Sequence, residues 1–221
     1  MTTAPRRAVA ALCTWLGRGG AQWWRRLCGT VRLVSGAQAE TARDVGRGSG
    51  AAATVALVPS SVTWWLLASW VIHDIEEVAT VAGFAERFER RFGRPLPVTP
   101  EQLAVAVGAV GVVVAAASAR GAATGGRSWL FRQVLLAHAA HSAWHVGASV
   151  VVRGYTPGVV TAAAVVGPHG WWALRRLRRS GEWSGSEQVA QLRTAVPGAV
   201  AATLGAHLLA RGVLRLARAR A

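Results

Sequence analysis

The stretch "TWWLLASWVIHDIEEVATVAGF", residues 63–84, decides the fold because it joins a strongly apolar run to a short polar insertion. The run before Val71 has the composition of a membrane-spanning helix. The insertion adds one histidine and three carboxylates, at His73, Asp74, Glu76 and Glu77. Ionisable side chains within a spanning helix are costly and usually mark a functional site. The stretch therefore predicts a membrane helix that carries part of a polar site.

The remainder of the chain also has the composition of a membrane protein. It has 221 residues, of which 52% are hydrophobic, and a mean hydropathy of +0.30. A bilayer requires about 20 apolar residues per helical span, and five blocks approach this length, near residues 53–78, 102–119, 129–152, 158–174 and 195–213. The chain has no alternating strands that could close a barrel, so these blocks must be helices. We expect an all-α, polytopic membrane helical bundle of about five transmembrane helices, with four as the alternative.

The first 50 residues differ from the rest and form a separate region, residues 1–50, ahead of the bundle at residues 51–221. The segment "AQWWRRLCGTVRLV" (Ala21–Val34) places its apolar residues on one helical side and its arginines off that side. This pattern is typical of a basic amphipathic helix on an anionic membrane surface. A polar, glycine-rich linker follows it.

The charge of the chain fits a membrane protein better than a nucleic-acid-binding protein. The net charge is +15 and every basic residue is arginine. The arginines fall between the apolar blocks, where they set membrane topology, and do not form one DNA-binding face. With 15 arginines on the N-terminal side and 9 on the other, the N-terminus is predicted to be cytoplasmic, although a basic C-terminal cluster argues the other way.

The polar insertion places three side chains on one side of its helix. His73, Glu76 and Glu77 fall within an arc of about 100°. They could bind a metal ion or act as acid and base inside the bundle. Alternatively, the insertion is a helix end whose carboxylates pair with Arg87 or Arg90 in solvent.

The third block supplies histidines that could complete such a site. In "LLAHAAHSAWHVGASVV", His138, His141 and His145 fall within an arc of about 60°. Neutral imidazole is the commonest metal ligand. At about 1.5 Å per residue, His73 lies about 30 Å and His145 about 24 Å from the membrane side at which both blocks begin. We therefore expect the two histidines at a similar depth in the bundle. His138 lies deeper and is expected to support a ligand.

The turn after the third block adds further candidates at the same end. In "VVRGYTPGVVT" (Val151–Thr161), proline and glycine predict a tight turn. Tyr155 is either an interfacial ring or a functional group that donates a proton or holds a ligand carboxylate, and Thr161 is a candidate supporting residue of the site. The isolated His169 and His207 are each expected to make a helix–helix hydrogen bond, with a metal-ligand role as the alternative.

These motifs together resemble the HXXEE-motif family of bacterial membrane proteins. The resemblance covers roughly residues 61–172 and rests on an HXXEE motif, a further histidine and a YXPG motif, which correspond to His73, Glu76, Glu77, His145, Tyr155, Pro157 and Gly158. It implies an integral protein of the bacterial cell membrane. It supports the location of the site and implies no particular reaction.

The residues favour a membrane metalloenzyme. We expect one or two ions of iron, manganese or zinc, bound by His73, Glu76, Glu77, His141 and His145. Glu76, Glu77 and Tyr155 are the candidate catalytic groups. A redox metal would support oxidation or desaturation of a lipid or other hydrophobic small molecule, and zinc would support hydrolysis.

Two other functions remain open from the sequence. A metal-independent isomerase or cyclase of a sterol or isoprenoid would use a buried glutamate to protonate an alkene. A non-enzymatic metal or haem carrier, or a scaffold, would need no catalytic group, although haem would leave the two glutamates unexplained. In every case the bilayer is the expected partner, and nucleic acid is not.

Overall fold

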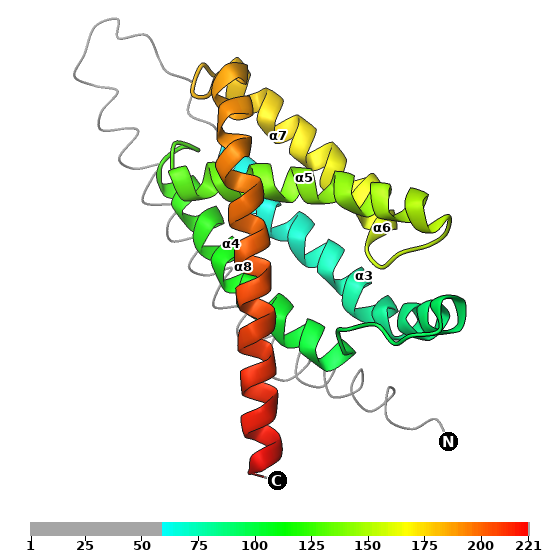
Figure 1. Ribbon diagram of the computed structural model, residues 1–221. Coiled ribbons are helices and arrows are strands. Elements are labelled where there is room, and N and C mark those ends of the chain that lie inside the picture. The colour runs from blue at the N-terminus through cyan, green and yellow to red at the C-terminus, as the bar shows by residue number, and fades with distance from the viewer. Residues whose placement is uncertain (1–58, 221) are drawn as a thin grey trace, which may run out of the picture. The chain divides into compact units, whose positions relative to one another are not determined.

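The computed structural model describes residues 59–220, all of which belong to one unit, Val55–Ala221. The predicted N-terminal arm and its amphipathic helix lie outside the described residues. Residues 59–220 contain helices and no strand, as Figure 1 shows. The elements are α3 (Ser60–Phe92), α4 (Pro100–Ala123), α5 (Trp129–Val152), α6 (Val159–Thr161), the π-helical segment η2 (Ala162–Val166), α7 (Gly167–Arg179) and α8 (Gly185–Ala219).

The helix bounds confirm two predicted blocks closely and extend two others. Helices α4 and α5 nearly coincide with residues 102–119 and 129–152, whereas α3 continues well beyond residue 78 and α8 begins ten residues before residue 195. The extensions end at local signals that a hydropathy pattern misses. Gly93 ends α3 in the left-handed conformation, and a capping box between Ser184 and Glu187 starts α8. The HXXEE motif consequently lies in mid-helix and not at a helix end.

Helices α3 and α5 run in the same direction and contact each other in matching order. Near their N-termini, Leu66 and Leu135 belong to one apolar cluster with Phe131. Further along, the Ser69 hydroxyl lies 3.2 Å from His138 Nε2. This order places an apolar core at one end of the helix pair and polar side chains toward the other.

The block predicted at residues 158–174 is interrupted by a π-helical segment. Segment η2 joins α6 to α7 immediately after Thr161. Single π-turns within helices are frequent at functional sites, since the extra residue redirects the preceding turn. Beyond it, α7 lies close against α5, because a Cβ on Gly170 would be 2.8 Å from Ala139 Cβ.

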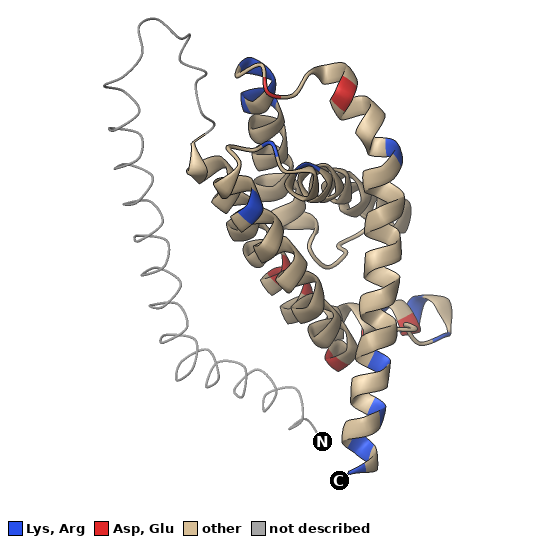
Figure 2. Cartoon of the chain, turned by 90° about the vertical axis from the view of Figure 1, so that its left-hand side faces the viewer, with Lys and Arg blue, Asp and Glu red and all other residues tan. Residues whose placement is uncertain are grey.

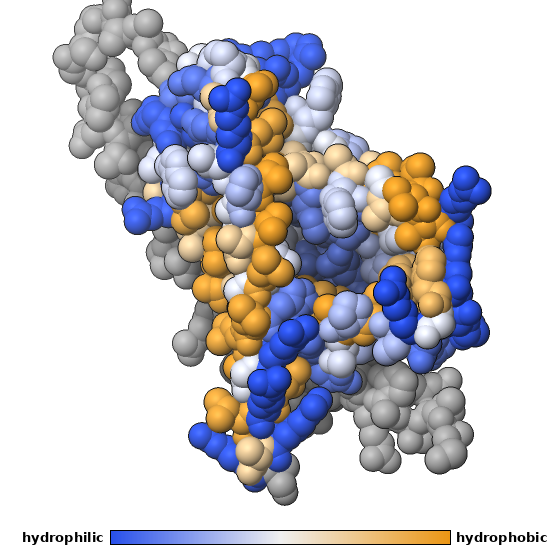
Figure 3. Space-filling view, in the orientation of Figure 1, coloured by the Kyte–Doolittle hydropathy of each residue, from blue (hydrophilic) through white to orange (hydrophobic). Residues whose placement is uncertain are grey.

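Helices α4 and α8 are long and apolar enough to cross a membrane, judged by length and composition. Their most apolar windows are only 28% and 11% buried, whereas the core helix of a soluble protein would be mostly buried. Figure 3 shows the resulting hydrophobic column along α8, and Figure 2 shows that α8 lacks acidic and basic residues over its middle. The large apolar side chains exposed on α8 are Val189, Val196, Val200, Leu204, Leu208, Leu209, Val213 and Leu216.

Candidate metal centre

Four potential metal-ligand atoms from α3 and α5 converge on one point. They belong to His73, Glu77, His141 and His145, and all lie within 4.8 Å of one another. The two α3 residues are four apart and the two α5 residues are four apart, so each pair shares one face of its helix. Parallel α3 and α5 bring these two faces together. His73 and His145 are buried, Glu77 is half-buried and His141 is exposed, so the group reaches the surface on one side.

The distances within this group are close to those around a single ion. Glu77 Oε1 lies 3.1 Å from His145 Nε2 and 3.9 Å from His73 Nε2, and the Nε2 atoms of His141 and His145 are 2.8 Å apart. Ligands about 2.0–2.2 Å from a tetrahedral ion lie roughly 3.3–3.6 Å from each other. Small adjustments of the four side chains would therefore form one coordination sphere.

A hydrogen bond at Nδ1 of His145 determines that Nε2 is the nitrogen that faces the other converging residues. His145 Nδ1 lies 2.8 Å from the carbonyl oxygen of Pro157. A carbonyl can only accept, so Nδ1 carries the hydrogen and donates it. In the neutral ring, Nε2 then presents a lone pair toward the Glu77 carboxylate, which is also an acceptor. Two acceptors 3.1 Å apart need a cation or a proton between them.

The position of the hydrogen on His73 is determined in the same way, by the Thr161 hydroxyl and the Glu76 carboxylate. The Thr161 hydroxyl donates to Glu76 Oε2 at 2.6 Å, so it must accept from His73 Nδ1, 3.0 Å away. His73 Nε2 is left without a hydrogen. Within residues 59–220 this buried nitrogen has no hydrogen-bond partner. Metal-ligating histidines usually donate their other ring nitrogen in this way.

Glu76 and Glu77 are adjacent in sequence but have different surroundings. The carboxylate of Glu76 accepts from the backbone nitrogens of Val160 and Thr161 at 3.3 and 2.7 Å, from the Thr161 hydroxyl, and from the Tyr155 hydroxyl at 2.7 Å. These partners occupy both of its oxygens. The structure therefore places Glu76 between α3 and the start of α6, outside the group of four converging ligand atoms.

Gly158 closes the group from the side of the α5–α6 loop. Its φ of +79° lies in the left-handed region, and an added Cβ would be 2.6 Å from His73 Cε1, 2.9 Å from Glu77 Cγ and 3.1 Å from His145 Cε1. Both the backbone conformation and the lack of space require glycine. The sequence predicted only a turn at this position, and nothing in the spacing showed that the turn contacts the ligands.

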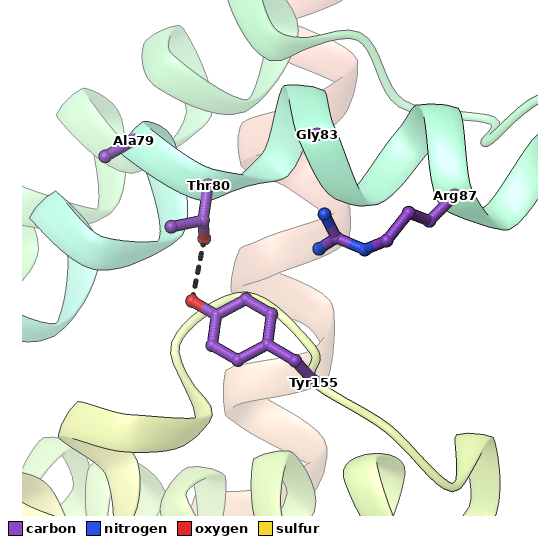
Figure 4. Close-up of a pocket in the computed structure, with 5 residues that line it drawn as sticks. All are labelled: Ala79, Thr80, Gly83, Arg87 and Tyr155. Carbon is purple, nitrogen blue, oxygen red and sulfur yellow. Dashed lines mark hydrogen bonds between the residues drawn. The ribbon is translucent and has the colours of Figure 1, made fainter.

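Tyr155 lies at the edge of the site, with its hydroxyl directed toward α3. It donates to Glu76 and is 3.1 Å from the Thr80 hydroxyl, as Figure 4 shows for Thr80. Partial burial raises the pKa of the Tyr155 hydroxyl, and the Glu76 carboxylate acts in the same direction. The hydroxyl therefore keeps its proton and serves as a hydrogen-bond donor.

His138 and His169 lie deeper in the bundle than the four converging residues. His138 Nε2 and His169 Nδ1 are 3.2 and 3.1 Å from the Ser69 hydroxyl, and the His138 ring centroid is 6.2 Å from that of His73. They join α3, α5 and α7 through one serine, a residue that no sequence motif marks. His207 on α8 is not one of the converging residues and lies 3.3 Å from the Gln102 amide.

The comparisons with known proteins agree with the motifs that form this site. Residues 64–173 match the sequence model of a family described as "Protein of unknown function with HXXEE motif". The matched region contains all four converging residues and the loop that closes over them. No curated protein and no solved structure matches the chain. The chain thus belongs to the HXXEE-motif family.

Proposed function

We propose that this chain is an integral membrane metalloenzyme acting on a lipid or another hydrophobic substrate. One observation carries the proposal: the unprotonated Nε2 atoms of His73 and His145 converge with the Glu77 carboxylate. Acceptors of this kind repel one another unless a cation lies among them. A divalent ion bound by these residues and His141 would supply that charge.

The ligand types narrow the choice of metal. Three imidazoles and one carboxylate suit zinc, iron or manganese. Bound zinc would activate a water for hydrolysis, whereas iron or manganese would support oxidation or desaturation. The chain's own residues hold the ligands in place, through the Pro157 carbonyl behind His145 and the Thr161 hydroxyl behind His73. His141 is exposed, which leaves one side of the site accessible to a substrate.

The surface and the site together support the proposed membrane location. Helix α8 exposes leucine and valine side chains that would be poorly solvated in water. Lipid covering these side chains would make α8 and α4 spans. We further propose five spans and a cytoplasmic N-terminus, with α3, α5 and the α6–α7 segment completing the bundle around the polar site. A substrate dissolved in the bilayer could then reach the site from the side.

Metal content per chain tests the proposal directly. The protein would be purified in mild detergent without a metal-affinity column, and zinc, iron and manganese would be measured by mass spectrometry. We expect close to one ion per chain, lost in Glu77→Ala and His145→Ala variants. His207→Ala is the matched control, since it removes a histidine outside the group and should keep the ion.

A metal-independent acid–base enzyme is the second candidate. The observation in its favour is the 3.1 Å distance between His145 Nε2 and Glu77, which also fits a protonated imidazole paired with the carboxylate. If the folded wild type is metal-free and takes up no zinc, iron or manganese on reconstitution, the metalloenzyme proposal is wrong. The acid–base enzyme, an isomerase or cyclase of a sterol or isoprenoid, then takes its place. A bound ion without any turnover of lipid would instead indicate a carrier or scaffold.

A further inference from the structure

A groove runs along α3 next to the metal centre. Figure 4 shows its two walls, α3 on one side and the α5–α6 loop on the other. Its volume is about 460 Å³, and it is lined by Ala79, Thr80, Gly83, Arg87 and Tyr155. Tyr155 belongs both to this groove and to the hydrogen-bond network around Glu76. The groove therefore adjoins the site without including any of the four converging residues.

Arg87 gives the groove a positive charge without an acidic partner among the described residues. Its guanidinium carbon lies 5.9 Å from the centre of the Tyr155 ring. It forms no ion pair or hydrogen bond with any residue between 59 and 220. A guanidinium group offers a planar fork of donors that matches the oxygens of phosphate and carboxylate groups. The charge is thus directed into a groove in which no acid neutralises it.

Gly83 provides the space at the base of the groove. A Cβ on Gly83 would lie 3.4 Å from Arg87 Nη1, so the guanidinium folds back along α3 to the level of this glycine. A glycine inside a helix is destabilising relative to alanine. Its presence in mid-helix leaves room beside the guanidinium that any longer side chain would occupy.

Aromatic side chains continue the groove beyond Arg87. Phe84, Phe88 and Phe92 follow one another along α3, with ring centroids 6.0 and 4.6 Å apart. They line a second hollow of about 210 Å³ that also contains Arg87 and Tyr155. An apolar wall beside an unpaired cation is complementary to an amphiphile that carries an anionic group.

We propose that Arg87 binds the oxyanion, phosphate or carboxylate, of an amphiphilic substrate whose reacting group enters the metal centre. This inference rests on the proposed function and names the substrate class for that site. The guanidinium lies beside Gly83, six residues after Glu77, which corresponds to about 9 Å along the helix. The bond that reacts is accordingly about 10 Å from the oxyanion.

Binding of a short-chain lipid tests the inference without depending on turnover. The full chain in uncharged detergent would be titrated calorimetrically with dihexanoyl phosphatidic acid, with dihexanoylglycerol, which lacks the phosphate, and with inorganic phosphate. We expect the phosphatidic acid to bind at least about tenfold more tightly than the neutral lipid, since a charge-assisted bond to arginine is lost without the phosphate. Inorganic phosphate binding as tightly as the lipid would identify a free phosphate as the source of the oxyanion.

Two variants locate the binding in the groove. Arg87→Gln removes the charge from an exposed residue, and Gly83→Leu fills the base of the groove. Each variant should weaken the binding of phosphatidic acid at least about tenfold. Arg120→Gln, at the far end of the bundle, is the control and should bind like the wild type. Unchanged affinity in both groove variants, or equal affinity for the two lipids, would overturn the inference.

A ligand variant separates this inference from the proposed function. Glu77→Gln should lose the metal ion while retaining its affinity for phosphatidic acid, since Glu77 does not line the groove. A wild type that holds the metal but shows no preference for the anionic lipid would refute the substrate class alone. A metal-free wild type that prefers the anionic lipid would refute the metalloenzyme and leave the oxyanion site in place.

Discussion

Replacing Gly158 with alanine is the sharpest test of how the loop and the metal ligands fit together. The substitution adds one methyl group directly against three of the four converging residues. Its carbon would lie 2.6 Å from His73 Cε1, 2.9 Å from Glu77 Cγ and 3.1 Å from His145 Cε1. Contacts this short require the loop, the ligands or both to move.

Two separate costs can be assigned to this change. The left-handed conformation at φ +79° costs a non-glycine residue roughly 1–2 kcal/mol. Overpacking against the imidazole and carboxylate side chains adds about 1–3 kcal/mol. The first cost lowers stability with or without metal. The second acts on the ligands themselves and should weaken metal binding about tenfold to a hundredfold.

Two other glycines separate these costs. Gly93 has a φ of +69°, whereas Gly154 lies in the same loop as Gly158 and has no positive φ. At both positions an added Cβ would have no atom within 4 Å. Gly93→Ala should lower thermal stability with or without metal and leave metal affinity unchanged, and Gly154→Ala should change neither. Metal affinity would be measured by competition with a chromophoric chelator. A Gly158→Ala protein that binds metal as tightly as the wild type would refute the described contact.

Three further outcomes are expected from the same structure. Thr161→Val should weaken metal binding about tenfold, because His73 Nδ1 loses its acceptor, and Thr161→Ser should restore it in the chelator competition. Glu76→Gln should lower the melting temperature in scanning fluorimetry yet keep the ion; loss of the ion would show that metal binding requires the carboxylate charge of Glu76. Gly121→Ala places a Cβ 2.6 Å from the Phe131 ring and should cost about 1–3 kcal/mol in denaturant titrations, with metal per folded chain unchanged; equal stability would contradict this packing.

The all-helical fold and the depth of the site along the helices could be predicted from the sequence, because both depend on the regular spacing of residues in a helix. Apolar blocks predicted α4 and α5 almost to their ends, and helical periodicity predicted that His73 would meet the histidines of α5. The ends of α3 and α8 were not predicted, because a glycine cap and a capping box set them and not hydropathy. The count of five spans remains a proposal, since within residues 59–220 only α4 and α8 meet the length and composition of a span.

The finer division of roles within the site could not be predicted from spacing alone. Glu76 and Glu77 both lie on the predicted arc, and only the position of the loop decides which one faces the histidines. That loop places the backbone nitrogen of Thr161 2.7 Å from Glu76 and leaves Glu77 beside His145. Contacts between segments more than 80 residues apart carry no signature in a single sequence. The role of Gly158 is hidden for the same reason.

The geometry also gives a physical reason for two adjacent glutamates in the motif. Neighbouring residues on a helix point about 100° apart, so one carboxylate can face α5 while the other faces the loop. Glu76 orders Thr161, Thr161 fixes the proton on His73 Nδ1, and the bare His73 Nε2 then lies opposite Glu77. Each glutamate thus acts on a different side of the same imidazole. A proton between Glu77 and His145 would satisfy that pair but would leave the buried Nε2 of His73 without a partner. One cation bound among the four side chains would satisfy all of these acceptors together.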